Sequence, residues 1–276
     1  GNIDLIVNNQ IINVPDIKRS FIQADKSVNE ILIKEDLAYL STGFGIIALD
    51  IIKQEISETF NLGPGGTYLQ VNETCIKDDT IYAACEDGVY YGGLKSNLID
   101  FQKWVKMEGL PTGNFNTIVA IEDKLVCNFQ FVGQWQKDTV YSYEGNNWIK
   151  KPLGNNYNYD NLEDLNVFDQ EIVASLSYAV KILDKNLTET NTIWQYGGTL
   201  FTPNLREAIK DGNEYWIADI NAALIHYYNT NKSEAISPSG PYYSDSWRMD
   251  YSNGHLWTTS GTLTTNMKNS FSNHGI

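Results

Sequence analysis

Apolar and polar residues alternate along most of the chain in short segments. Examples are VNEILIK from Val28 and FNTIVAI from Phe115. Clusters of Gly, Asn and Asp interrupt these segments every eight to twelve residues or so, roughly the spacing of short strands and their turns. Alternation with a period of two predicts half-buried strands rather than helices. The one stretch with helical character, NLREAIKDG from Asn204, occupies a place where the other repeats have a strand, so we expect a strand there too.

The strand pattern itself repeats along the chain. In each copy a polar turn residue, usually Asp, stands three residues before an aromatic or β-branched anchor. The anchors are Tyr39, Tyr82, Val126, Ile172, Trp216 and Trp257. Successive anchors lie 43, 44, 46, 44 and 41 residues apart, and further alternating segments precede and follow each of them. A unit of four antiparallel strands repeated at this period is the signature of a β-propeller blade.

We therefore predict an all-β fold, a β-propeller of about six four-stranded antiparallel blades, with seven blades as the alternative. A single propeller is expected over residues 1–276. The repeats run near residues 28–70, 71–114, 115–161, 162–204 and 205–245, and residues 246–276 and 1–17 are expected to share one blade. Because the first and last repeats are incomplete, we expect the chain to be a fragment of a longer protein.

The composition supports a folded protein rich in sheets, since 42% of the residues are hydrophobic and 12% are aromatic. The 34 acidic residues outnumber the 20 basic ones, which gives a net charge of −14. Such a charge opposes binding to phosphate backbones, so we expect no nucleic-acid partner. No run of apolar residues is long enough to span a bilayer, and we expect no direct membrane insertion.

The cysteines and histidines do not form a recognisable site. If Asp78 and Asp79 form the tip of a hairpin, Cys75 lies opposite Tyr82, and a disulfide to Cys85 is not favoured. Small buried thiols are therefore expected for all three cysteines, and neither the histidines nor the acidic residues show the spacing of a zinc or calcium site. We predict no metal and no cofactor. The sets concerned are Cys75, Cys85 and Cys127, and His226, His255 and His274.

The acidic turn Glu86-Asp87-Gly88 separates two strand segments, and its carboxylates and glycine are residue types that ligand-binding loops also contain. The corresponding turns of the other repeats do not share its carboxylates, so we interpret it as a structural hairpin. Motifs for a nucleophile elbow or a phosphate-binding loop are absent from the sequence. We therefore predict no catalytic residues and a protein that is not an enzyme.

Three long loops carry aromatic residues, and in a propeller all three would lie on one face. Aromatic side chains beside Asn and Gly suit protein docking or stacking on sugars; the alternative is that they pack locally under the loops. If they bind a partner, Trp135→Ala and Tyr157→Ala should weaken its capture without unfolding the chain. The candidate binding residues are Phe131 and Trp135 in NFQFVGQWQKD, Tyr157 and Tyr159 in LGNNYNYDN, and Tyr242 and Tyr243 in SGPYYSD.

The sequences of the repeats resemble those of known propellers of the bacterial envelope. The segments NGHLWTTSG and GNEYWIADINAALIHYY resemble propeller repeats in the periplasmic sensor regions of two-component regulators of Bacteroidetes. The segments GNIDLIVNNQIINVPDIKRS, VNEILIKEDLAYLSTGFGIIALDIIKQEI and YAACEDGVYYG resemble the N-terminal propeller region of PorZ-like proteins associated with the type IX secretion system.

The PorZ-like resemblance implies a non-enzymatic, extracytoplasmic module at the periplasm or cell surface. It also implies a part in attaching secreted cargo to anionic lipopolysaccharide. We therefore expect a binding or scaffolding propeller whose partner is a protein of the secretion or envelope machinery, or an envelope glycan. A periplasmic sensor propeller of a hybrid two-component regulator is the alternative, and a propeller lyase or glycosidase is the third hypothesis.

Overall fold

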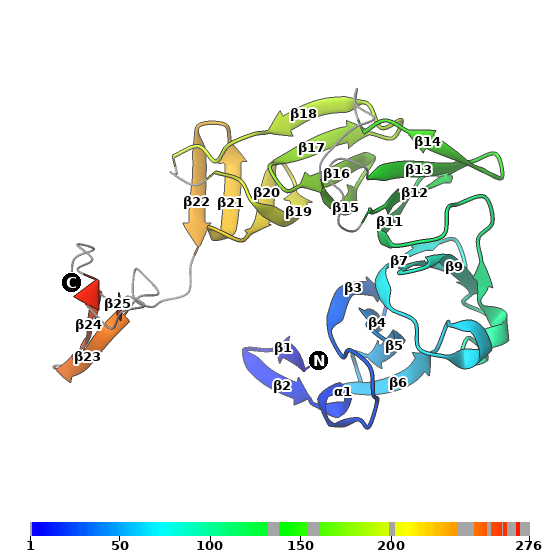
Figure 1. Cartoon of the computed structure of the whole chain (residues 1–276), viewed down its shortest axis with the longest axis horizontal. Coiled ribbons are helices and arrows are strands. Elements are labelled where there is room, and N and C mark those ends of the chain that lie inside the picture. Colours follow the sequence, from blue (N-terminus) through cyan, green and yellow to red (C-terminus); the bar gives the residue numbers. More distant parts are fainter. Residues whose placement is uncertain are drawn as a thin grey trace. The chain divides into compact units, whose positions relative to one another are not determined.

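Five antiparallel sheets of four strands each follow one another along the chain (Figure 1). This computed structural model describes residues 2–131, 138–153, 161–198 and 202–236, and the backbone of residues 246–252, 255–260, 262–263 and 269–270. The chain divides into two compact units, Gly1–Ala235 and Ile236–Ile276. The first unit contains all five of these sheets.

Each sheet is a blade whose strands follow the order of the sequence from the inner to the outer edge. Blade 1 contains β3 (Val28–Lys34), β4 (Leu37–Thr42), β5 (Gly45–Asp50) and β6 (Glu55–Phe60). Blade 2 contains β7 (Val71–Lys77), β8 (Thr80–Cys85), β9 (Gly88–Gly93) and β10 (Val105–Lys106). Blade 3 contains β11 (Phe115–Ile121), β12 (Lys124–Phe129), β13 (Thr139–Glu144) and β14 (Asn147–Lys151). Blade 4 contains β15 (Leu162–Phe168), β16 (Glu171–Leu176), β17 (Ala179–Asp184) and β18 (Glu189–Ile193). Blade 5 contains β19 (Leu205–Asp211), β20 (Glu214–Asp219), β21 (Ala223–Asn229) and β22 (Lys232–Ile236).

The prediction of an all-β propeller with four-stranded antiparallel blades is confirmed, but the predicted number of six or seven blades is wrong. Five four-stranded blades are present in the described part of the chain, because its end segments form only two-stranded sheets. These are β1 (Ile3–Val7) with β2 (Gln10–Val14), β23 (Ser246–Ser252) with β24 (His255–Ser260), and β25 (Thr262–Leu263) with β26 (Asn269–Ser270). Whether residues 1–17 and 246–276 share a blade stays a prediction.

The turn between the first two strands of every blade has the same local geometry. Its first residue adopts a left-handed backbone, with φ between 51° and 60°. Asp and Gly tolerate this conformation well, and in blades 1, 2, 3 and 5 this residue directly precedes the polar residue that recurs three positions before the anchor. The stretch from Asn204 is also a strand, as expected, because β19 occupies the first position of its blade. The five turn residues are Glu35, Asp78, Glu122, Asp169 and Gly212.

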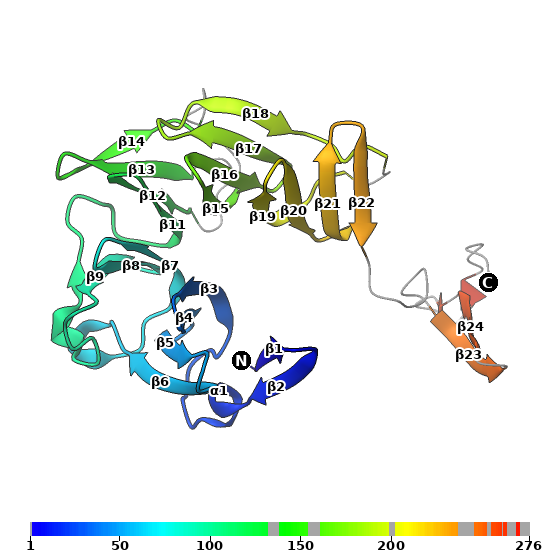
Figure 2. The same ribbon diagram turned by 180° about the vertical axis from the view of Figure 1, so that it is seen from behind.

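The first strands of consecutive blades are neighbours in space. Contacts join β3 to β7, β7 to β11, β11 to β15, and β15 to β19. Figures 1 and 2 show these five strands on the inner side of the curve that the blades of the first unit follow. Since the inner strands run side by side in the same direction, equivalent residues of the five repeats lie at the same level along the propeller axis.

The hydrophobic core consists of layers between neighbouring blades rather than one central cluster. Between blades 1 and 2, Ile46 and Phe60 pack with Val71 and Ile81. Equivalent layers lie between the later blades. A further layer covers the other side of blade 1, where Ile17 of the short helix α1 (Asp16–Arg19) is buried together with residues of β1 and β2. Each blade is thus held by apolar burial against its neighbours.

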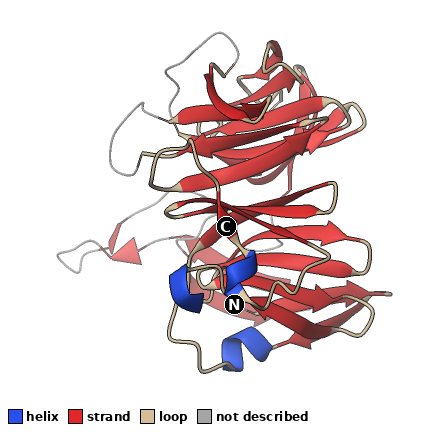
Figure 3. Ribbon diagram, turned by 90° about the vertical axis from the view of Figure 1, so that its right-hand side faces the viewer, coloured by secondary structure: helices blue, strands red, loops and turns tan. Residues whose placement is uncertain are grey.

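Helical structure is sparse, as the view coloured by secondary structure shows (Figure 3). Besides α1, the described residues contain two single 3₁₀ turns, Pro64–Gly66 and Phe101–Lys103. Among the described residues, no helix is long and apolar enough to cross a membrane. Strands and the links between them therefore position the side chains considered below.

Candidate functional site

Every inner strand has a β-bulge at the same repeat position. The register shifts between Val28 and Glu30 in blade 1, and equivalent shifts occur in the other four blades. A bulge redirects side chains, and its recurrence makes it a property of the repeat rather than an accident of one blade. In each blade, the second and third residues of the inner strand lie at this bulge. These pairs are Asn29 and Glu30, Asn72 and Glu73, Asn116 and Thr117, Glu163 and Asp164, and Arg206 and Glu207.

The second residue of each inner strand links one blade to the next. In the first three blades it is an asparagine whose side-chain amide donates to the backbone carbonyl of the first residue of the following inner strand. These bonds, each 2.7 Å long, run from Asn29 to Val71, from Asn72 to Phe115 and from Asn116 to Leu162. Between blades 4 and 5 an ion pair takes this place, with Arg206 donating to Glu163 at 2.6 Å.

The third residue of the inner strand provides a second link between blades. Glu73 accepts a hydrogen bond from the backbone N–H of Ile118 at 2.9 Å. One blade later, the Thr117 hydroxyl accepts from the N–H of Leu165 at 3.1 Å. The inner strand is the edge of its sheet, and its backbone groups would otherwise lack partners. The repeated side-chain bonds satisfy several of these groups and join neighbouring blades.

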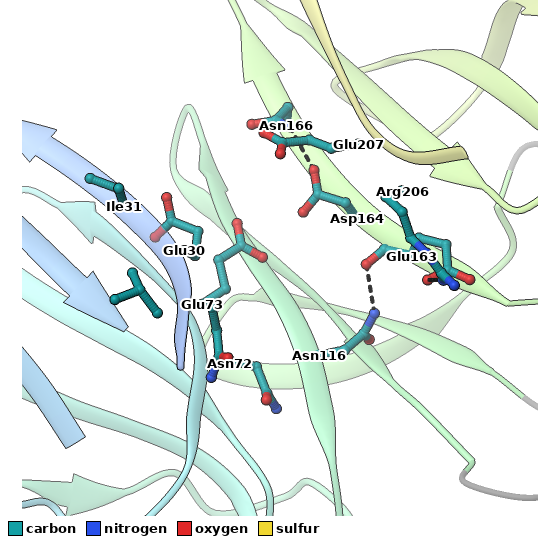
Figure 4. A pocket seen from close by; sticks show the side chains of 12 residues that line it. Glu30, Ile31, Asn72, Glu73, Asn116, Glu163, Asp164, Asn166, Arg206 and Glu207 are labelled. Atoms are coloured by element: carbon teal, nitrogen blue, oxygen red, sulfur yellow. Dashed lines mark hydrogen bonds and ion pairs between the residues drawn. The ribbon is translucent and has the colours of Figure 1, made fainter. Parts of the chain in front are cut away.

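The bulges surround a cavity of about 580 Å³, which we call the axial channel. Its lining comes from the inner strands of all five blades and from no other element. Figure 4 shows the carboxyl groups of Glu30, Glu73 and Asp164 pointing toward one another, although they come from blades 1, 2 and 4. The lining residues are Val28, Asn29, Glu30, Ile31, Asn72, Glu73, Asn116, Glu163, Asp164, Asn166, Arg206 and Glu207.

Burial and mutual repulsion alter the titration of these carboxyl groups. Burial, together with the charges of Asp164 and Glu207, raises the pKa of Glu30 to about 8. Burial and the charge of Glu207 raise the pKa of Asp164 to about 7. The pKa of Glu73, which is only 8% exposed, is raised by burial and by the charge of Asp164. The axial channel therefore retains protons near neutral pH, because like charges in a shielded space favour the neutral form.

The axial channel is rich in acceptors and poor in free donors. Asn72, Asn116 and Asn166 each donate two side-chain bonds within the protein. In contrast, the Glu30 Oε2 atom is shielded from solvent and has no hydrogen-bond partner. Among the described residues, no group of three or more His, Cys, Asp or Glu side chains is arranged to hold a metal ion.

A second candidate surface lies at one end of the blades. We call it the link face, and it contains the links between the second and third strands and the links from one blade to the next. Three aromatic contacts lie there. Phe131, 40% exposed, packs edge-on against Phe129 with ring centroids 4.9 Å apart. Trp194, 57% exposed, stacks on Tyr178 at 5.9 Å, and exposed Tyr68 packs against buried Phe44 at 6.1 Å.

Phe131 is anchored by its blade. Its ring continues an aromatic column, since Phe129 in turn packs against the fully buried Phe115. The buried carboxyl of Asp138 accepts from the backbone N–H of Phe131 at 3.3 Å and from that of Leu162 at 2.9 Å. An exposed aromatic ring is thus held on a rigid support, which lowers the entropic cost of using it in binding.

Of the predicted binding residues, only Phe131 lies within the described residues. The other five, Trp135, Tyr157, Tyr159, Tyr242 and Tyr243, lie outside them. Trp194, Tyr178 and Tyr68 were missed because each is a single aromatic residue in a link of ordinary length. The axial channel was missed as well, although the repeated triplets Val-Asn-Glu at Val28 and Val71 and Phe-Asn-Thr at Phe115 carried its signal.

The other sequence interpretations can be placed directly. Cys75 lies opposite Tyr82, and all three cysteines are free and buried, with the pKa of each thiol raised by burial. The Glu86-Asp87-Gly88 turn is a hairpin, in which Asp87 accepts from Tyr90 and from Lys106, both at 3.0 Å. Both partners belong to the same blade, so this turn has a structural role.

Comparison with known proteins supports the resemblance seen in the sequence. Residues 1–105 match the family described as the N-terminal beta-propeller domain of PorZ of the type IX secretion system. The structure is similar to that of PorZ from Porphyromonas gingivalis, described as an essential bacterial surface component of that system. The TM-score is 0.70 at 21% identity, and the match covers 97% of this chain and 34% of PorZ. The chain thus spans about a third of the PorZ chain it matches.

Two extracellular domains of regulators from B. thetaiotaomicron share the fold. One belongs to a putative hybrid two-component system, with a TM-score of 0.59 at 13% identity, covering 94% of this chain and 36% of that one. The other belongs to a putative one-component system, with a TM-score of 0.56 at 13% identity and the same two coverages. At such identities the likeness shows the fold alone. No protein of curated function matches the sequence.

Proposed function

We propose that this chain is a non-enzymatic binding and scaffolding propeller of a bacterial envelope system related to type IX secretion. It acts outside the cytoplasm, at the periplasm or cell surface, and binds a protein of the secretion or envelope machinery through the link face. The observation that carries this proposal is the PorZ family match of residues 1–105, in a chain whose link face exposes supported aromatic side chains. An envelope glycan related to lipopolysaccharide is the alternative partner.

The chemistry of the link face favours a protein partner. Exposed aromatic residues with rigid supports are typical anchors of protein interfaces, because they bury a large area while losing little rotamer freedom. Phe131 belongs to one blade, whereas Tyr178 and Trp194 belong to the next, so a partner that contacts both spans two blades. Trp135, Tyr157 and Tyr159, which lie outside the described residues, stay predicted binding residues.

The test uses alanine variants at described positions. Phe131→Ala and Trp194→Ala, alone and combined, should weaken capture of secretion-system proteins from a Bacteroidetes envelope extract by about tenfold or more, the effect of losing an interface hot spot. The matched control is Ile52→Ala, which removes an exposed apolar side chain from the turn between β5 and β6 at the other end of blade 1. Equal capture by all the variants would contradict the use of the link face.

The sensor propeller of a two-component regulator is the second candidate. It is supported by the fold likeness to the extracellular domains from B. thetaiotaomicron over 94% of this chain. The full-length gene separates the two candidates. Kinase and DNA-binding modules after a membrane-spanning helix would support the sensor, whereas a secretion signal and a short C-terminal β domain would support the scaffold.

Catalysis, the third hypothesis, has a direct test. The axial channel brings carboxyl groups together, as glycosidases do, but one of them, Glu73, has a structural role because it joins its blade to the next. We expect no turnover of envelope polysaccharides by the purified chain. Turnover that disappears in Asp164→Asn would instead revive the enzyme hypothesis.

A further inference from the structure

We propose that the axial channel binds an organic cation, namely an alkylammonium or guanidinium group. This inference goes beyond the proposed function, because it concerns a different surface from the link face. It rests on the cavity of about 580 Å³ and on the set of polar groups that lines it. That volume lies within the range of roughly 300–1,000 Å³ that small-molecule sites occupy.

The hydrogen-bonding groups of the lining determine what a ligand must bring. The amides of Asn72, Asn116 and Asn166 already donate to carbonyl or carboxyl oxygens of the protein. Arg206, the one basic residue of the lining, donates to Glu163, and its side chain is 58% exposed. A ligand that offered only acceptors would find few free donors, whereas one with several N–H groups would find acceptors on several sides.

The acceptors left for such a ligand are the carboxyl oxygens that line the axial channel. Glu30 Oε2 has no partner although it is shielded from solvent, and a buried acceptor without a partner costs free energy. Glu73, Asp164 and Glu207 line the same space, and the charges of Asp164 and Glu207 act on Glu30. A cation placed among these groups would relieve their repulsion and supply the missing donor.

An organic cation fits the cavity better than a metal ion. The described carboxyl groups are not arranged to hold a metal, and the cavity is many times larger than a single ion. Ammonium and guanidinium groups instead carry three and five N–H donors, which can reach carboxyl groups on different blades. Such a group could come from a free polyamine or from a lysine or arginine side chain on a loop of a partner protein.

The experiment is calorimetric titration of the purified full chain at about pH 7.5, with two probes. One probe is spermidine, and the other is a short cyclic peptide that presents one arginine. Binding places a cation among carboxyl groups that retain protons, so it should release protons, detected as a heat that depends on the ionisation enthalpy of the buffer. The triple variant Glu30→Gln, Asp164→Asn, Glu207→Gln should raise the Kd at least about tenfold, because it removes three of the carboxyl groups that line the axial channel.

The control variant is Glu55→Gln, Glu58→Gln, Glu108→Gln, which removes the same number of charges at exposed positions outside the lining of the axial channel. It should bind like the wild type. The channel variant should remain folded, since each substitution replaces a repelling carboxyl group by a neutral amide, and thermal unfolding checks this. If only spermidine binds, the source is a free polyamine; if only the peptide binds, it is a partner side chain. No binding of either probe, or equal loss in both variants, would overturn the proposal.

Discussion

Glu30 offers a test of whether the axial channel holds protons. Its environment disfavours charge on balance, because burial and the charges of Asp164 and Glu207 outweigh the backbone N–H groups of Ile31 and Thr74, which favour the carboxylate. Arg206 is the only basic residue of the lining, and it is paired with Glu163. The substitution Glu30→Gln keeps the shape of the side chain and removes its charge. Its amide can also donate to a neighbouring carboxyl group.

The direction of the pH effect follows from the raised pKa. A carboxyl group whose pKa is higher in the folded state stabilises the fold at low pH, and this contribution is lost as pH rises through the folded value. For Glu30 the loss extends from the ordinary value of 4.5 to about 8. That difference corresponds to about 5 kcal/mol at most, of which about 3 kcal/mol falls between about pH 5.5 and pH 8.5. Asp164, with a pKa raised to about 7, adds to the effect in the same direction.

The assay is urea unfolding followed by tryptophan fluorescence at these two pH values. We expect the wild type to be less stable at the higher pH, and Glu30→Gln to reduce the difference by about 2 kcal/mol, since the remaining carboxyl groups relax when one charge is removed. Glu108→Gln removes an exposed charge and should leave the difference unchanged. The reasoning is refuted if Glu30→Gln shows the same pH dependence as the wild type.

Three further predictions concern the links between blades and the thiols. Asn116→Ala removes two bonds to the carbonyls of Leu162 and Glu163, and should lower the free energy of unfolding by about 1–3 kcal/mol; an unchanged urea midpoint would contradict this. Arg206→Met breaks an exposed ion pair and should cost less than about 1 kcal/mol, an effect that vanishes in high salt; a larger loss that persists in salt would refute it. Cys75, Cys85 and Cys127 should not react with a thiol reagent until urea unfolds the chain, and rapid labelling of the native protein would show that a thiol is accessible.

The regular part of the fold could be predicted because the same local sequence pattern recurs in every blade. The left-handed turn residue before each anchor and the alternation within each strand recur in all five blades, so weak signals support one another. The number of blades could not be predicted in this way. The end segments have the alternation of strands, but alternation does not say which strands pair, and β1 pairs with β2 alone.

The candidate sites were less accessible to sequence reasoning. The axial channel depends on a bulge, and a bulge leaves no mark in an alternating pattern except polar residues such as Asn29 and Glu30 side by side in a strand. Phe131 was found because it stands in a long loop, whereas Trp194 stands directly after β18 and looked like part of the strand pattern. For the axial channel the missing information was the arrangement of neighbouring blades, and for Trp194 it was the stacking on Tyr178 within one blade.

The most direct test of the proposed scaffolding role is photo-crosslinking from the link face in living cells. A photoreactive phenylalanine analogue replaces Phe131 or Trp194 in a Bacteroidetes cell that carries the type IX secretion system, and Asp78, in an exposed turn at the opposite end of blade 2, serves as the control position. We predict crosslinks from positions 131 and 194 to a component or cargo of the secretion system, identified by mass spectrometry, and none from position 78. Crosslinks to such proteins from position 78 alone, or from none of the three positions, would contradict the account.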